Sequence, residues 1–285
     1  PAPMATAPQA PAPMAPAPVP TAPAPAAGPA SIMPAMPTQA GDEAPPVASD
    51  APPAANDVVG AIKQLLLRGL QVFSPVAGMT TLLVAAVYLP TSLLAQIGLL
   101  LLPLSLAGIL ALLLTLVQLA AMLIVLPALY RYIIGAYLGQ PVDLRTTVNE
   151  QVPRAADVIV NCDIPLAVFG VFAGPIYWVE GKKLGDVISR NFNLLGKNLV
   201  PILGAAFGVG LAAGLVIFIP SYILAYLPLG GLLASLWGNV IASVVVAFFA
   251  AFSVATYFDM RRSLEGGDPE GEARARLAAP ALPPG

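Results

Sequence analysis

The chain has 285 residues, of which 58% are hydrophobic and only 10% charged, and its formal net charge is −2. Soluble domains usually carry about 25% charged residues, so this composition argues against an ordinary water-soluble protein. There is no histidine and a single cysteine, Cys162, which removes the commonest general base and any intrachain disulfide. The sequence therefore predicts no catalytic site, no metal, no cofactor and no nucleic-acid partner.

Residues 1–58 form a low-complexity Pro/Ala tail that holds 17 of the 32 prolines. With few large apolar side chains this tail cannot offset its ordering entropy, so we expect it to be disordered with a polyproline II bias. It could bind a proline-recognition module, or act as a semi-rigid spacer, which we favour. Because the sequence begins within this tract, we expect that a soluble domain can precede it in a longer parent protein.

Residues 59–73 read as a short amphipathic helix that lies in the membrane interface. The next apolar run has no charged residue from 69 to 130. One helical crossing needs about 20 residues, so we predict a hairpin over 75–130, with its turn between Pro90 and Pro103.

Residues 131–163 are polar, and a short apolar stretch follows at 164–179. We expect this stretch to be a re-entrant or interfacial element, and a thin fifth crossing is the alternative. A second interfacial helix is predicted over 182–197, and a second uncharged hairpin over 199–258. We expect 263–285 to be a disordered C-terminal tail.

The two halves repeat at an offset of about 126 residues. Each half has an interfacial helix, a hairpin with paired breakers, and an exit tyrosine, Tyr130 or Tyr257. Since each unit makes an even number of crossings, the repeats would be parallel. The predicted fold is an all-α polytopic membrane protein, a four-helix transmembrane bundle over 59–262 made from two hairpin repeats.

Basic residues flank the apolar runs on one side only, among them Lys63, Arg68, Arg131, Lys182, Lys183, Arg190, Lys197, Arg261 and Arg262. Positive residues favour the cytoplasmic face. We therefore place both termini in the cytoplasm and both hairpin turns on the far side of the membrane.

The segment 256–266 reads Thr-Tyr-Phe-Asp-Met-Arg-Arg-Ser-Leu-Glu-Gly. It resembles the closing motif of a bacterial integral-membrane family related to the membrane domain of some glycerophosphoryl diester phosphodiesterases, through Tyr257, Phe258, Asp259, Arg261, Glu265 and Gly266. Residues 179–181 and the helix after them are similar to that family's inter-hairpin element, with Asn191 where a serine is usual. The resemblance covers about 59–268 and implies a location in the bacterial inner membrane. The family's phosphodiesterase activity belongs to a separate soluble barrel, so the resemblance implies no enzyme.

Four groups of residues are candidates for function. Asp259, Arg261, Arg262 and Glu265 could bind a lipid headgroup or a phosphate, although we favour a topology anchor. Gln118 and Asn239 could line a solute path, although we favour interhelical hydrogen bonds. Small residues in the third crossing could form a homo-oligomer seam, although we favour packing within the bundle; these are Gly204, Gly208, Gly210 and Gly214. Asp157, Asp163 and Glu180 are the weakest candidates, for an intramembrane lipid-modifying enzyme.

These features favour a non-enzymatic membrane module that anchors or scaffolds an unknown protein partner, or an upstream domain, through the tail. A transporter or channel for an uncharged or lipid-like solute is the alternative. The uncharged crossings argue against a charged proton relay within them.

Overall fold

A computed structural model describes residues 57–140, 142–163, 170–196 and 198–278. Residues 1–56 of the tail predicted over 1–58, and the first part of the predicted re-entrant stretch, 164–169, lie outside this range; Asp57 and Val58 belong to the cap and start of a helix. The regular elements in the described residues are all helical, which confirms the all-α prediction. They are α1 (Val58–Phe73), α2 (Ala77–Leu101), α3 (Leu104–Tyr137), α4 (Leu144–Gln151), η1 (Val152–Arg154), α5 (Ala155–Val158), η2 (Ile159–Asp163), α7 (Ala173–Pro175), η3 (Ile176–Glu180), α8 (Leu184–Gly196), α9 (Leu199–Leu224), α10 (Gly230–Glu265) and α11 (Pro269–Ala278).

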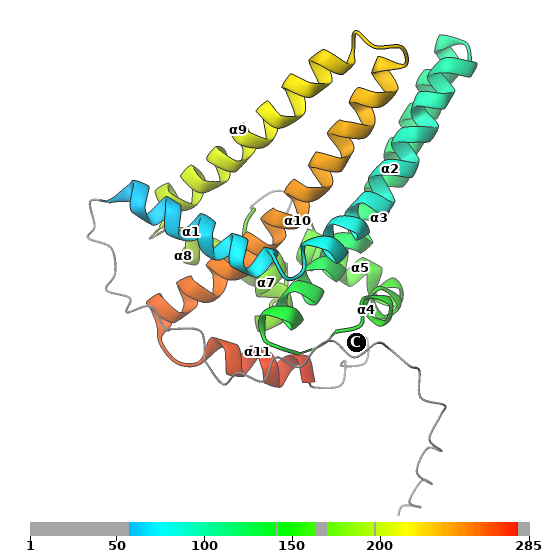
Figure 1. Ribbon diagram of the computed structural model, residues 1–285. Helices are drawn as coiled ribbons and strands as arrows, with labels where there is room; N and C mark the ends of the chain where they lie inside the picture. The colour runs from blue at the N-terminus through cyan, green and yellow to red at the C-terminus, as the bar shows by residue number, and fades with distance from the viewer. Residues whose placement is uncertain (1–56, 141, 164–169, 197, 279–285) are drawn as a thin grey trace, which may run out of the picture. The chain divides into compact units, whose positions relative to one another are not determined.

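Four of these helices, α2, α3, α9 and α10, are long and apolar enough to cross a membrane. They form two hairpins whose turns lie at the same end, away from the short helices (Figure 1). Pro103 caps the start of α3, as a residue without an N–H can. Pro90, which we expected at the first turn, lies inside α2 instead, and Pro220 likewise lies inside α9.

Helix α10 is the centre of the described fold, since it packs against α1, α2, α3 and α9. In its most apolar stretch 56% of residues are buried, against 11–17% in the other three long helices. The exposed faces of α2, α3 and α9 are rich in leucine, and that of α9 also carries Phe207 and Phe218. Such continuous apolar exposure is unfavourable in water and suits contact with lipid.

Helix α1 confirms the expected amphipathic helix, but it docks on the second hairpin, against α9 and α10. Asp57 caps its start by accepting a hydrogen bond from the Gly60 N–H over 2.8 Å. Phe73 meets Phe248 edge to face with ring centroids 5.7 Å apart. The buried face of α1 runs through Leu65 and Phe73, whereas Leu70 is 52% exposed.

The two longest helices, α3 and α10, continue beyond the sequence-predicted crossings. A 36-residue helix is about 54 Å long, whereas a bilayer core is about 30 Å thick. Every residue from 250 to 258 is buried by the chain itself, and so are Pro127–Tyr130. These segments pack with α4, α5, α7, α8 and α11 into a compact unit that we call the helical base (Figure 1). The exit tyrosines therefore lie inside protein and not at an interface.

The predicted disorder from residue 263 onward is wrong for 263–278. Helix α10 continues to Glu265, and α11 follows after the positive-φ residues Gly266 and Gly267. Asp268 accepts a hydrogen bond from the Gly271 N–H over 2.8 Å at the start of α11. Ala273 is buried, and the charged side chains of α11 pair with arginines of α10. The order of this segment thus comes from tertiary contacts that its own composition does not reveal.

Candidate functional site

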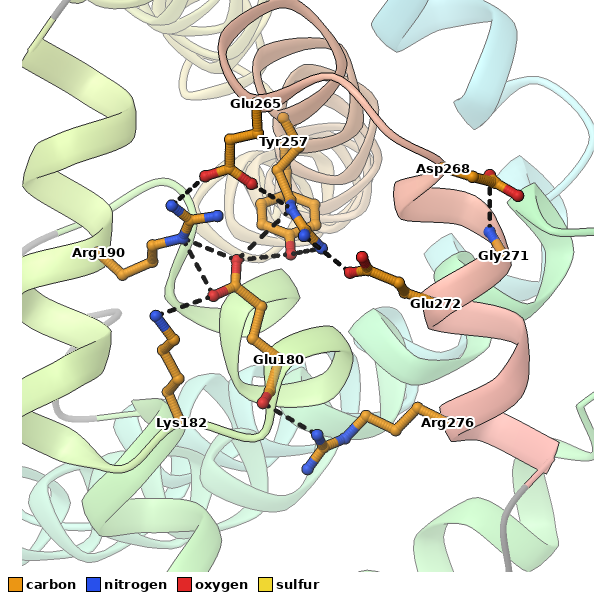
Figure 2. A network of polar contacts seen from close by, with 10 residues as sticks. Glu180, Lys182, Arg190, Tyr257, Glu265, Asp268, Gly271, Glu272 and Arg276 are labelled. Atoms are coloured by element: carbon orange, nitrogen blue, oxygen red, sulfur yellow. Dashed lines mark hydrogen bonds and ion pairs between the residues drawn. The ribbon is translucent and has the colours of Figure 1, made fainter.

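The main polar cluster of the helical base is centred on Glu180, the last residue of η3 (Figure 2). Its side chain is only 9% exposed. Arg190 of α8 donates from Nε to both carboxylate oxygens, over 2.9 and 3.0 Å. Tyr257 of α10 donates its hydroxyl over 2.9 Å, and the Lys182 Nζ lies 3.2 Å away. A buried carboxylate needs such compensation, because desolvation disfavours its charged form.

The chain reverses after Glu180 at Gly181, whose φ is +63°. A Cβ at this position would lie 1.4 Å from Nη2 of Arg276. Arg276 of α11 donates to the backbone carbonyl of Glu180 over 2.9 Å. The left-handed conformation favours glycine here, and a larger residue would also displace the guanidinium of Arg276.

The predicted headgroup cluster does assemble, but it is joined to other elements. Arg261 donates to Glu265 over 3.0 Å and to Glu272 of α11 over 2.8 Å. Glu265 also pairs with Arg190. Arg261 and Glu265 thus link α8, α10 and α11 around Glu180.

Asp259 and Arg262 lie on the other side of the same helix turn. Asp259 accepts from Arg68 of α1 over 2.6 Å and lies 3.6 Å from Arg262. Arg262 also pairs with Glu270 of α11. Each of the four predicted cluster residues therefore has a protein partner of opposite charge, which fits an anchoring function better than a vacant headgroup site.

The two polar residues singled out in the long helices make contacts between helices. The Gln118 Oε1 in α3 accepts a hydrogen bond from Thr91 of α2 over 3.1 Å. Asn239 of α10 donates to the Ser92 hydroxyl of α2 over 2.9 Å. Ser92 also lies 2.7 Å from the Ser235 hydroxyl. These contacts favour the packing interpretation over an open polar path.

The glycines of α9 are not equivalent. A Cβ at Gly204 would come within 2.7 Å of the Ile62 Cδ1, so the absence of a side chain at Gly204 leaves room for α1. A Cβ at Gly208, Gly210 or Gly214 would meet no atom within 4 Å in the described parts of the chain. Packing within the bundle is therefore the wrong interpretation for these three positions, because they face outward from α9.

Asp163 is a buried carboxylate with a different environment. It is 5% exposed, and neither oxygen has a hydrogen-bond partner in the part of the chain described by the structure. Burial raises the pKa of Asp163 to about 7. Asp157, by contrast, accepts hydrogen bonds from Asn161 over 2.8 Å and from the Tyr177 hydroxyl over 2.8 Å. The carboxylates proposed for catalysis thus have different environments.

A pocket of about 350 Å³ opens between α3, α4 and α11, and Arg131 lines it. Arg131 pairs with Glu150 and lies over the Trp178 ring at 5.4 Å. Among the described residues, no group of three or more His, Cys, Asp and Glu side chains is placed to hold a metal ion. The pocket lined by Arg131 and the Glu180 cluster are two polar candidates for a functional site in the helical base.

The sequence alone did not point to Glu180 as the centre of a cluster, nor to Arg190, Glu270 and Glu272 as partners of Arg261 and Arg262. The only local signal was the unusual density of charge in 259–276 of a chain that is otherwise poor in charge. Comparison with known proteins adds nothing to this site: no family model, no curated protein and no solved structure matches the chain.

Proposed function

We propose that the chain is a non-enzymatic integral membrane module that anchors or scaffolds a partner, or an upstream domain joined through the Pro/Ala tail. One observation carries the proposal: the prominent polar groups of the fold bond to one another. The hydroxyls and amides between the long helices pair across helices, and the arginines around Glu180 pair with carboxylates. Polar groups that are matched in this way help the fold to hold its shape in the membrane, and the buried side chains of Asp163 and Gln151 are exceptions, since they have no hydrogen-bond partner among the described residues.

The proposed topology places the helical base and both termini in the cytoplasm of a bacterial cell, with the hairpin turns outside. The basic residues gathered in α1, α8 and the end of α10 support this orientation. The two hairpins would be parallel repeats. Residues 164–179 would be a re-entrant element, in keeping with the short irregular helices α7 and η3 at its end. The family resemblance remains part of this proposal.

Cysteine labelling tests the topology, because the native Cys162 is buried and leaves a low background. Leu104→Cys and Tyr226→Cys probe the turns, where the native side chains are 83% and 75% exposed. Ala275→Cys probes the exposed side of α11. We expect an impermeant maleimide to label the first two from outside intact cells, and the third only after lysis. Labelling of Ala275→Cys in intact cells would contradict the orientation.

The anchoring function is tested with photo-crosslinking residues placed along the tail and, as a control, on the exposed face of α9. We expect one discrete protein adduct from the tail positions and only lipid adducts from α9. Deleting 1–56 should abolish the adduct while the remaining chain still resists carbonate extraction. Absence of any protein adduct along the tail would argue against a scaffold.

A transporter or channel for an uncharged solute is the second candidate. Two observations favour it: the serine and asparagine cluster between α2 and α10, and the short interrupted helices over 152–163 and 173–180. Broken helices often line solute cavities in membrane proteins. If purified protein in liposomes conducts a neutral solute, and Asn239→Leu stops that flux while Thr115→Val does not, transport replaces anchoring as the function. Thr115 is the control because its hydroxyl bonds only within α3, to the Ala111 carbonyl.

A further inference from the structure

We propose that Arg261 and Arg262 are two neighbouring anion-binding positions at the end of α10, which the carboxylates of α11 occupy in this conformation and from which phosphate groups displace them. The Glu272 carboxylate pairs with Arg261, and the Glu270 carboxylate pairs with Arg262, each where the anion would bind. Carboxylate and phosphate oxygens accept from the same guanidinium donors with the same geometry. Helix α11 is thus an internal ligand of the site. Only the source of the phosphate, a lipid headgroup, rests on the proposed membrane function.

Helix α11 is attached in a way that allows release. It has ten residues, too few for a stable isolated helix. It buries only Pro269 and Ala273 among its described residues. Gly266 and Gly267, with φ of +66° and +77°, form a flexible connection to α10. The attachment of α11 therefore depends largely on its polar contacts.

Each of the two ion pairs is exposed at one partner only. The Glu272 side chain is 64% exposed and that of Arg261 is 12% exposed, while the Arg262 side chain is 52% exposed and that of Glu270 is 15% exposed. Water and salt reach the exposed partner of each pair and weaken the contact. Two further contacts run from Arg274 and Arg276 to the carbonyls of Leu138 and Glu180. Figure 2 shows Glu272 and Arg276 of α11 pointing toward the Glu180 cluster. A phosphate at the arginines would compete with the two carboxylates directly.

The position of the site favours a lipid headgroup as the source of phosphate. Asp259 bridges Arg262 to Arg68, and Arg68 belongs to the amphipathic helix α1. A helix of that kind lies at the headgroup level of a bilayer. The cytoplasmic leaflet is also rich in anionic lipid, which attracts clustered arginines. Free phosphate has the same chemistry, and the experiment below separates the two sources.

Hydrogen exchange of the α11 amides tests the proposal on the full chain in nanodiscs. The baseline is phosphatidylcholine alone, whose phosphate is neutralised by the choline cation of the same headgroup, and the test conditions add either the net-anionic phosphatidylglycerol or soluble inorganic phosphate. Sodium chloride at matched ionic strength controls for screening. We expect phosphatidylglycerol to speed exchange in α11 by about tenfold, as loss of two weak contacts allows. A response to inorganic phosphate alone would identify soluble phosphate as the anion. An equal response to chloride, or no response to any anion, would overturn the proposal.

Matched variants separate anion binding from simple loosening of α11. Glu270→Gln with Glu272→Gln should give fast exchange in every lipid and bind the anion more tightly than the parent chain. Arg262→Gln should also exchange fast, with no remaining response to the anion. Arg274→Gln is the control, because it removes the contact with the Leu138 carbonyl and leaves both proposed ligands intact. The Arg274→Gln variant should exchange faster than the parent chain and still respond to the anion.

If Arg262→Gln keeps the response of the parent chain, the assigned site is wrong. Carbonate extraction of each variant reports membrane insertion separately, so loss of the membrane module would be recognised as such.

Discussion

The hydroxyl of Tyr257 donates a hydrogen bond to the carboxylate of Glu180 over 2.9 Å, and so joins the buried end of α10 to the chain reversal after η3. Tyr257 is fully buried and Glu180 nearly so. Arg190 and Arg261 complete the surroundings of the carboxylate from α8 and α10. Because four separate segments meet at Glu180, this residue is the point at which the helical base is most sensitive to change.

Replacing Glu180 by glutamine should destabilise the base by about 2–4 kcal/mol, since removing one partner leaves buried charge uncompensated. Tyr257→Phe removes a single hydrogen bond and should cost about 1 kcal/mol. Thermal unfolding in detergent, followed by near-UV circular dichroism, measures both effects. Glu150→Gln is the control, because the Glu150 side chain is 41% exposed. Equal effects for the Glu150 and Glu180 variants would show that the cluster has no special importance.

Asp163 should make the stability of the chain depend on pH. Its pKa is raised by burial, from 3.8 to about 7, so the folded state holds a proton that the unfolded state has released between these values. Stability then falls as pH rises from about 4 to about 7 and stays reduced above that. The full penalty is at most about 4 kcal/mol at 1.36 kcal/mol per pKa unit.

Asp163→Asn keeps the shape of the side chain and removes this ionisation. The variant should therefore melt at a higher temperature than the parent chain at pH 8 and at nearly the same temperature at pH 4.5. Asp143→Asn is the control of opposite sign, since hydrogen bonds from Thr146 lower the pKa of the exposed Asp143 carboxyl. A parent chain and Asp163→Asn variant that melt together at pH 8 would show that Asp163 stays protonated or finds a partner.

Most of the long helices could be predicted from the sequence, because uncharged runs of this length have few alternatives in lipid. The ends of these helices could not be predicted from the sequence. Residues 250–258 carry no charge, like the residues of α10 before them, yet protein surrounds them. Burial in protein and burial in lipid select the same side chains, so composition did not separate the crossing from the helical base.

The candidate site was predicted only in part, for a related reason. Asp259, Arg261, Arg262 and Glu265 stand out locally because they follow an uncharged run. Their partners Glu180, Arg190 and Glu272 lie up to 81 residues away, counting from Arg261 to Glu180. Pairing over such distances depends on the tertiary fold. The same holds for α11, whose short Ala/Arg/Glu sequence has too little apolar surface to signal a docked helix.

The hydrogen bonds between the long helices should contribute modestly to stability. Asn239→Ala removes the bond to Ser92 and should cost about 1 kcal/mol, and Gln118→Ala, which removes the bond to Thr91, about the same or less. A double-mutant cycle of Asn239→Ala with Ser92→Ala isolates the shared contact. We expect a coupling energy of about 0.5–1 kcal/mol for this pair, and none between Asn239 and Gln118, which share no partner here. A coupling near zero for Asn239 and Ser92 would mean that the contact does not form in the membrane.

Gly204 and Gly208 are a matched pair in α9, one turn apart, that should respond differently to the same substitution. Valine at Gly204 would run into Ile62 of α1, where even a Cβ comes within 2.7 Å. Gly204→Val should therefore loosen α1 from α9, raise proteolysis within 58–73 and cost about 1–3 kcal/mol.

Gly208→Val meets open space within the described chain, so it should leave both the stability and the protection of α1 near parent values. The Gly208→Val variant also tests self-association, because Gly208, Gly210 and Gly214 face outward from α9. If Gly208→Val left stability unchanged but shifted the mass of the detergent-solubilised protein toward a smaller assembly, the outward glycines would be contacting a second copy. An unchanged mass would leave lipid as their neighbour, in line with the exposed leucines and phenylalanines that share this helix.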